Sequence, residues 1–109
     1  MPTYKLKCMF DWGSGVCLWS CNKEAKEKFG DYPIEEMEKL PLSAELRKEL
    51  EYLIIEHDKA LNWDDPGGDL LWSDRQVADF KQRAAQAYEQ LVHELGSDFQ
   101  VEFKESWLI

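Results

Sequence analysis

Alternating apolar and polar positions predict three short strands along the chain. The first covers Tyr4–Phe10, the second Val16–Cys21, and the third the residues from Phe99 to Lys104. Successive side chains of a strand point to opposite faces, so the first and third strands would each bury one face of a sheet. The connection Asp11–Gly15 is short and contains two glycines, which permit the positive φ of a tight turn. We therefore expect the first two strands to form an antiparallel hairpin.

Two long helices are predicted from apolar stripes at helical spacing. The first begins after Ser43, a good N-cap, and extends to about Asn62. The second begins after Ser73, which with Gln76 fits a capping box, and it stops at Gly96. The stripes are Leu46, Leu50, Leu53, Ile54, His57 and Leu61 in the first helix, and Val77, Phe80, Ala84, Ala87, Tyr88, Leu91 and Leu95 in the second.

Shorter helical segments are expected between the hairpin and the first long helix. Asn22 can cap a helix over Lys23–Phe29 that Gly30 would end. The segment Asp31–Leu40 is ambiguous, with room for one helical turn around Ile34–Met37.

The main elements follow the order β-β-α-α-β, which predicts an α+β fold. Each strand buries one face, so the two long helices would cover one side of a three-stranded, mostly antiparallel sheet in the order 2-1-3. With 109 residues, of which 44% are apolar, we expect a single domain over residues 1–109. The N-terminus does not resemble a signal peptide, and the apolar runs are too short for a membrane span. We expect the apolar tail, residues 105–109, to be docked.

The three cysteines, Cys8, Cys17 and Cys21, invite a zinc hypothesis that their spacing does not support. Residues four apart on a strand lie roughly 13 Å from each other, too far for two ligands of one ion. Cys8 can approach Cys17 across the hairpin, but no CxxC or HxxxH spacing is present. We expect reduced thiols in a cytoplasmic protein, without a metal or a cofactor.

Acidic residues are concentrated in the middle of the chain, and the net charge is −9. Residues 31–79 contain fourteen acidic and five basic side chains, whereas the first thirty residues contain five lysines and three acids. Such a field repels nucleic acid and speeds association with a basic protein. An acidic surface can also serve solubility alone. Its confinement to one part of the chain favours a directed binding face.

The loop from Trp63 to Asp74 is the strongest candidate for that face. It combines aspartates with large apolar side chains, as expected of a binding surface for a basic protein. In the alternative interpretation, Trp63 and Leu71 pack inward and the aspartates are ordinary turn and cap residues. The candidate partner-binding residues are Asp64, Asp65, Asp69 and Trp72, with Asp11 and Trp12 of the hairpin turn and Glu35 and Glu36 as outer members.

His57 lies on the apolar stripe of the first long helix, so we expect a partly buried, structural side chain. A catalytic histidine requires a nucleophile and an orienting acid nearby, and no serine or cysteine lies in a nucleophile motif. Paired carboxylates such as Asp64–Asp65 are abundant, but the pattern of an EF-hand is absent. The glycines are not followed by the Lys-Ser/Thr of a phosphate loop. A small enzyme or ligand-binding protein that uses His57 with a carboxylate cluster remains the alternative.

Several phrases of the sequence resemble a family of small bacterial proteins over nearly the whole chain. They are Met9-Phe10-Asp11-Trp12-Gly13, Leu18-Trp19, Pro41-Leu42-Ser43-Ala44-Glu45-Leu46, His57-Asp58-Lys59-Ala60-Leu61-Asn62-Trp63 and Glu94-Leu95-Gly96-Ser97-Asp98-Phe99. That family includes immunity proteins of contact-dependent growth inhibition systems. The resemblance implies a small, non-enzymatic inhibitor that sequesters a cationic nuclease toxin, but it assigns no functional residues.

The sequence thus predicts an acidic immunity or inhibitor protein that blocks the active site of a basic, nuclease-type toxin. We expect the protein to be a monomer or a weak dimer that binds neither nucleic acid nor membrane. A third possibility is a homo-oligomer whose contact is formed by the tail Trp107-Leu108-Ile109.

Overall fold

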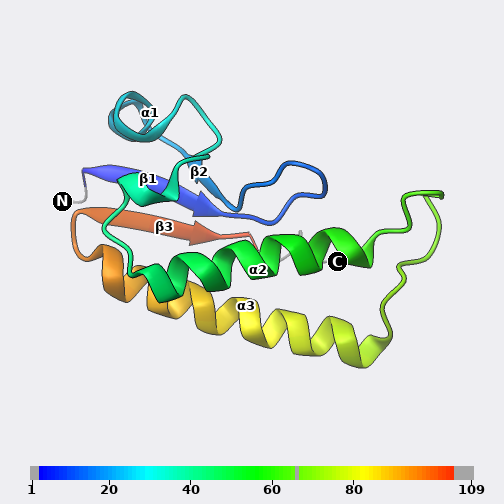
Figure 1. The fold of residues 1–109 in the computed structure, drawn as a ribbon. Helices are drawn as coiled ribbons and strands as arrows, with labels where there is room; N and C mark the ends of the chain where they lie inside the picture. The colour runs from blue at the N-terminus through cyan, green and yellow to red at the C-terminus, as the bar shows by residue number, and fades with distance from the viewer. Residues whose placement is uncertain (1–2, 66, 105–109) are drawn as a thin grey trace.

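The computed structural model describes residues 3–65 and 67–104, and Figure 1 shows an α+β arrangement of three strands and their helices. The elements are, in order, β1 (Tyr4–Cys8), β2 (Leu18–Ser20), α1 (Lys23–Phe29), the 3₁₀ helix η1 (Met37–Lys39), α2 (Ala44–Ala60), α3 (Asp74–Leu95) and β3 (Phe99–Phe103). Within the described residues, no helix is both long enough and apolar enough to cross a membrane. The expectation for the C-terminal tail lies outside the described residues.

The sheet has the predicted strand order β2-β1-β3. β1 and β2 are antiparallel, with Leu6 opposite Ser20, so the hairpin is confirmed. β1 and β3 are parallel, with Leu6 opposite Val101, which makes the sheet mixed. The parallel pairing follows from topology. α3 returns the chain to the end of the sheet at which β1 begins, and β3 then starts from that same end (Figure 1).

The strands of the hairpin are shorter than the sequence pattern predicts, by two residues at the turn end of each. Ser14 Oγ contacts both backbone groups of Val16, accepting from its N at 3.4 Å and donating to its O at 3.2 Å. The indole Nε1 of Trp19 donates to Met9 O at 2.9 Å. Side chains therefore form hydrogen bonds with backbone groups that would pair with the neighbouring strand in a regular antiparallel ladder. Met9, Val16 and Trp19 form a small separate apolar cluster there.

The short helix α1 has the predicted bounds, and Asn22 caps it by accepting from Ala25 N at 3.0 Å. The predicted helical turn around Ile34–Met37 is wrong in position, because η1 covers Met37–Lys39. Backbone bonds from Ser20 N to Tyr32 O and from Ile34 N to Leu18 O hold residues 32–34 extended along β2. The turn can therefore begin only after that segment.

Capping defines both long helices as predicted. Ser43 accepts from Leu46 N at the start of α2. Ser73 and Gln76 form a complete capping box at the start of α3, and Gly96 ends that helix. α2 ends at Ala60, close to the expected Asn62.

One apolar core joins the sheet to both long helices. Leu6 and Cys8 of β1 are buried together with Leu50 of α2 and Leu91 of α3. α1 contributes Phe29 to the same core. In Figure 1, α1 lies beside β1 and β2, whereas α2 and α3 lie together beyond β3. The prediction of two long helices on one face of the sheet is therefore confirmed.

Candidate partner-binding surface

α2 and α3 are antiparallel, so the helix pair has two different ends (Figure 1). We call residues 43–51 and 84–96 the closed end, where α2 begins and α3 finishes. The open end comprises residues 52–83, including the α2–α3 loop, together with the β1–β2 loop at residues 9–17. Both predicted binding loops belong to the open end.

Trp12 fixes the β1–β2 loop onto α2. Its indole ring stacks on the His57 imidazole, with centroids 4.6 Å apart and planes at 7°. Its Nε1 donates to His57 O at 2.7 Å. The loop therefore cannot move away from α2 without losing both an aromatic contact and a hydrogen bond.

His57 is only 1% exposed, so it is more deeply buried than the partly buried side chain that its place on the apolar stripe predicts. Its Nε2 has no hydrogen-bond partner among the described residues. Phe10 and Phe80 also contact its ring, with centroids 5.8 and 5.6 Å away. Burial lowers the pKa of His57, against the opposing charges of Asp58 and Asp11. A neutral imidazole enclosed by three aromatic rings supports the structural interpretation. It also argues against the enzyme alternative, because a substrate could reach the ring only if Trp12 moved.

Gly13 and Trp63 bring the two loops of the open end into contact. Gly13 N donates to Asp58 Oδ1 at 3.0 Å, and Trp63 Nε1 donates to Asp58 O at 2.9 Å. Gly13 has a φ of +83°, and a Cβ at this position would lie 3.4 Å from the Trp63 ring. The positive φ therefore favours a glycine here, whereas the space beside Trp63 would admit a Cβ at ordinary van der Waals contact.

The α2–α3 loop is held back onto α2 by its backbone. Leu71 N donates to Ala60 O at 2.8 Å, and Asp64 N donates to Asn62 Oδ1 at 3.1 Å. The side chains of Trp63 and Leu71 nevertheless project outward, with 56% and 62% of their surface exposed. The interpretation in which these two residues pack inward is wrong, and the loop presents two large apolar side chains to solvent.

Exposed carboxylates surround these apolar side chains. Among the residues that the structure describes, those of the open-end loops form no ion pair. Ion pairs elsewhere include Glu36–Lys39 and Glu49–Arg83. At the open end, the carboxylates that form no such pair include Asp11, Asp58, Asp64, Asp65, Asp69 and Asp74. Carboxylates outside the open end, such as Glu35, Glu51 and Glu89, also form none within the described part of the chain, so what distinguishes the open end is the exposed apolar side chains among its carboxylates.

The candidate residues fall into two groups. Asp64, Asp65 and Asp69 lie exposed on the α2–α3 loop, and Asp11 and Trp12 lie on the β1–β2 loop that packs beside it. Three members of the set, Trp72, Glu35 and Glu36, depart from the expected picture. Trp72 is half-buried, with its ring 5.1 Å from Phe80.

Glu35 and Glu36, the outer candidates, lie away from the open end. They line a shallow depression with Phe29 and Lys39, between α1 and η1. Lys39 Nζ is 3.2 Å from Glu36 Oε2, so one of the two charges is already compensated. The structure therefore does not join these two glutamates to the loop aspartates.

The three cysteines differ in burial. Cys8 and Cys17 are buried next to each other across the hairpin, and Cys21 is exposed. A hydrogen bond with Cys8, together with burial, raises the pKa of Cys17 well above the ordinary value. Within residues 3–65 and 67–104, no group of three or more His, Cys, Asp or Glu side chains has a geometry that could hold a metal ion.

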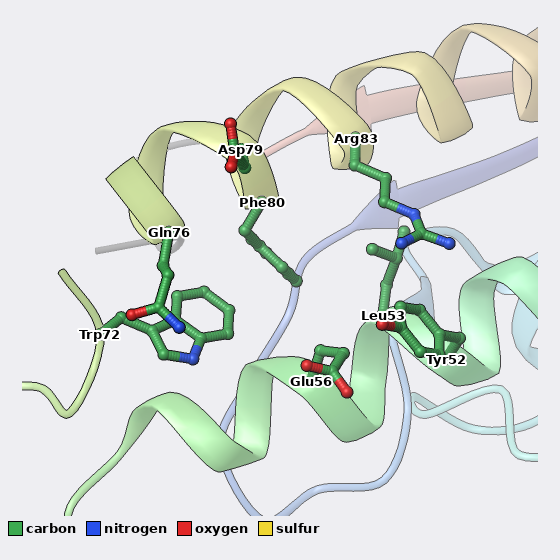
Figure 2. A pocket seen from close by; sticks show the side chains of 8 residues that line it. All are labelled: Tyr52, Leu53, Glu56, Trp72, Gln76, Asp79, Phe80 and Arg83. Carbon is green, nitrogen blue, oxygen red and sulfur yellow. The ribbon is translucent and has the colours of Figure 1, made fainter. Parts of the chain in front are cut away.

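One further feature of the open end was not predicted. A groove between α2 and α3 is lined by side chains from both helices, including Tyr52, Glu56, Asp79 and Arg83 (Figure 2). Tyr52 and Glu56 are four residues apart, beside the apolar stripe of α2, and Asp79 and Arg83 have the same spacing on α3. This spacing indicates that each pair of residues shares one face of its helix. It does not reveal that the two faces lie next to each other and form a groove.

Exposed apolar side chains among carboxylates, on loops that hydrogen bonds connect to α2, form a candidate protein-binding surface on a small α+β scaffold. The chain belongs to the Serratia CdiI immunity protein-like family, whose model matches residues 4–106. A search among curated proteins finds no match. Family membership confirms the resemblance noted from the sequence and supports an immunity or inhibitor role.

Proposed function

We propose that this protein binds a basic, nuclease-type toxin domain through its open end and blocks the active site of that toxin. The observation that carries the proposal is the combination of exposed Trp63 and Leu71 with unpaired aspartates on loops that are fixed to α2. A nuclease binds phosphate with basic side chains, so a carboxylate surface is complementary to its active site. The inhibitor would act in the cytoplasm as a monomer or weak dimer, without a cofactor.

Charge and apolar contact have separate parts in this interaction. The aspartates raise the association rate and set its salt dependence, because exposed charges act mainly on encounter. Trp63 and Leu71 provide apolar area that becomes buried, which lowers the dissociation rate. Since the loops are already fixed, little conformational freedom is lost on binding.

The test is a calorimetric titration of the cognate toxin domain, encoded beside the immunity gene, with two charge-matched double variants. Asp64→Asn with Asp65→Asn removes two charges at the open end. Glu35→Gln with Glu36→Gln removes two charges elsewhere. We expect the first variant to bind about tenfold more weakly at low salt and the second to change affinity less than about twofold.

Two results would contradict the proposal. If the wild-type protein does not bind the toxin domain at micromolar concentrations and low salt, the inhibitor function is wrong. If the Glu35/Glu36 variant weakens binding as much as the Asp64/Asp65 variant, the open end is not the contact surface. An affinity that does not fall as salt rises would argue against a charge-driven encounter.

A further inference from the structure

The groove at the open end has an apolar floor and a size that suits a single side chain. Leu53 and Phe80 are buried at its base, and Trp72 forms one wall while Tyr52, 44% exposed, forms another (Figure 2). Its volume is about 170 Å³. Pockets for small-molecule ligands usually measure roughly 300–1,000 Å³, so a metabolite would not be enclosed here.

Two carboxylates line the groove, Glu56 from α2 and Asp79 from α3 (Figure 2). Gln76 also lines it, and its Oε1 accepts from Ser73 N at 2.8 Å in the capping box, which leaves its amide nitrogen as a donor. Glu56 contacts the exposed Lys59 at 3.1 Å, while Asp79 has no ion pair among the described residues.

Arg83, the basic residue that lines the groove, is already occupied. Its Nε lies 3.0 and 3.1 Å from the two carboxylate oxygens of Glu49, and its NH2 lies 2.8 Å from Oε1. Its guanidinium also lies over the Tyr52 ring at 4.4 Å. Arg83 is therefore paired with neither Glu56 nor Asp79, and it supports the Tyr52 wall. Because Glu56 is paired with Lys59, Asp79 is the groove carboxylate that has no ion pair among the described residues.

The contacts of Arg83 show how a guanidinium binds beside an aromatic ring and a carboxylate in this part of the molecule. A guanidinium there lies over an aromatic ring and forms a paired bond to a carboxylate. The groove offers the same kinds of group to a second guanidinium, because an aromatic ring, Trp72, and two carboxylates, Glu56 and Asp79, all line it. Arginine stacks on aromatic faces and is more weakly hydrated than lysine, and its stem suits an apolar floor.

We propose that the groove between α2 and α3 receives one arginine side chain of the toxin domain. This inference rests on the proposed function, and it assigns a particular contact to the binding surface. Trp72 makes the groove continuous with the acidic α2–α3 loop, so one basic partner can cover both. The carboxylates would bind the guanidinium while Trp72 covers its face.

Binding to the toxin domain tests the groove with matched variants. Glu56→Gln with Asp79→Asn removes one carboxylate from each helix within the groove. Glu51→Gln with Glu89→Gln removes one exposed carboxylate from each helix outside it. We expect the groove variant to weaken binding at least about tenfold and the control to change it less than about twofold.

An isolated probe tests the groove without the toxin. Nα-acetyl-arginine methylamide is titrated into the isotopically labelled protein, and the Trp72 indole N–H resonance is followed by NMR. We expect saturable shifts at millimolar concentrations that the Glu56/Asp79 variant loses and the Glu51/Glu89 control retains. The corresponding lysine amide should bind more weakly.

The outcomes separate the two proposals. If the toxin binds equally well to the groove variant and its control, the groove inference is wrong while the inhibitor function stands. If the wild-type protein does not bind the toxin, the inhibitor function is wrong, and the arginine titration then decides on the groove alone. Equal or tighter binding of the lysine amide would overturn the assignment to arginine.

Discussion

The two ends of the α2–α3 pair differ in how they are held together and in how many apolar side chains they expose. At the closed end, Glu94 of α3 accepts from Ser43 N at 2.6 Å and from Ser43 Oγ at 3.1 Å, which joins the end of one helix to the start of the other. Leu91 and Leu46 are almost fully buried there. At the open end, similar apolar side chains such as Leu71 lie in solvent.

Both ends bury apolar side chains between the helices and the sheet, but only the open end adds a loop on which two large apolar side chains, Trp63 and Leu71, are exposed. Alanines at positions 84 and 87 of α3 are buried and allow close packing at the closed end. The open end instead has larger side chains around a groove, and its loops are held by backbone and indole hydrogen bonds. These hydrogen bonds fix the loops of the open end without burial of the exposed apolar side chains.

The largest expected effect comes from the same substitution at each end. Leu91→Ala should lower the free energy of unfolding by about 3 kcal/mol, because a fully buried leucine leaves a cavity. Leu71→Ala should change it by less than about 0.5 kcal/mol, because the side chain is exposed and the bond from its backbone N is retained. Urea denaturation of both variants measures the difference.

Toxin affinity should show the opposite order for these two variants. Leu71→Ala is expected to weaken binding, while Leu91→Ala should retain wild-type affinity under conditions in which it remains folded. A Leu71→Ala variant with lowered stability and unchanged affinity would mean that this leucine belongs to the core and not to the binding surface.

A smaller effect is expected from glutamates at the two ends. Glu94→Ala removes both acceptors from Ser43 and should cost about 1 kcal/mol, since the carboxylate is largely exposed and solvent reduces its contribution. Glu56→Gln at the open end should cost less than about 0.5 kcal/mol, because it loses only a surface contact to Lys59. Thermal and urea denaturation provide the measurement.

A result in which Glu56→Gln is the more destabilising of the two would contradict the comparison. The Glu56 carboxylate would then contribute to the stability of the fold, and it would not be available to bind a partner. Ser43→Ala is the matching control at the closed end, because it removes one partner of Glu94 and the N-cap together.

The parts of the fold that depend on local signals could be predicted from the sequence. Ser43, Ser73 with Gln76, and Gly96 carry their own capping chemistry, so the helix bounds followed directly. The strand order followed from the element order and the need to bury one face of each strand. Each of these inferences uses residues that are close in sequence or general rules of topology.

The parts that depend on long-range contacts could not be predicted. The position of η1 is set by bonds between residues 32–34 and β2, which have no local signal. The composition of the α2–α3 loop made it a candidate, yet the sequence could not decide whether Trp63 and Leu71 point outward. The groove is lined by Glu56 of α2 and Asp79 of α3, and this depends on how the two helices pack.

The two ends should also respond to acid in different pH ranges. Burial lowers the pKa of His57 at the open end, so its stabilising contribution is complete above the ordinary histidine value of about 6.5 and is lost as the pH falls through the lowered value. The hydrogen bond from Ser43 N lowers the pKa of Glu94 at the closed end. Its contribution is complete above about 4.3 and is lost as the pH falls further.

Variants at each end should remove one part of this pH dependence, which is the smallest of the expected effects. In urea titrations from pH 7.5 to pH 3.5, His57→Gln should abolish the decrease in stability that begins below about pH 6.5. Glu94→Gln should leave that decrease intact and reduce the one below about pH 4.3. The slopes are compared within each variant, because His57→Gln also alters packing against Trp12 and Phe80. If His57→Gln retains the full slope between pH 6.5 and 5, the neutral, buried imidazole is not what couples the open end to pH.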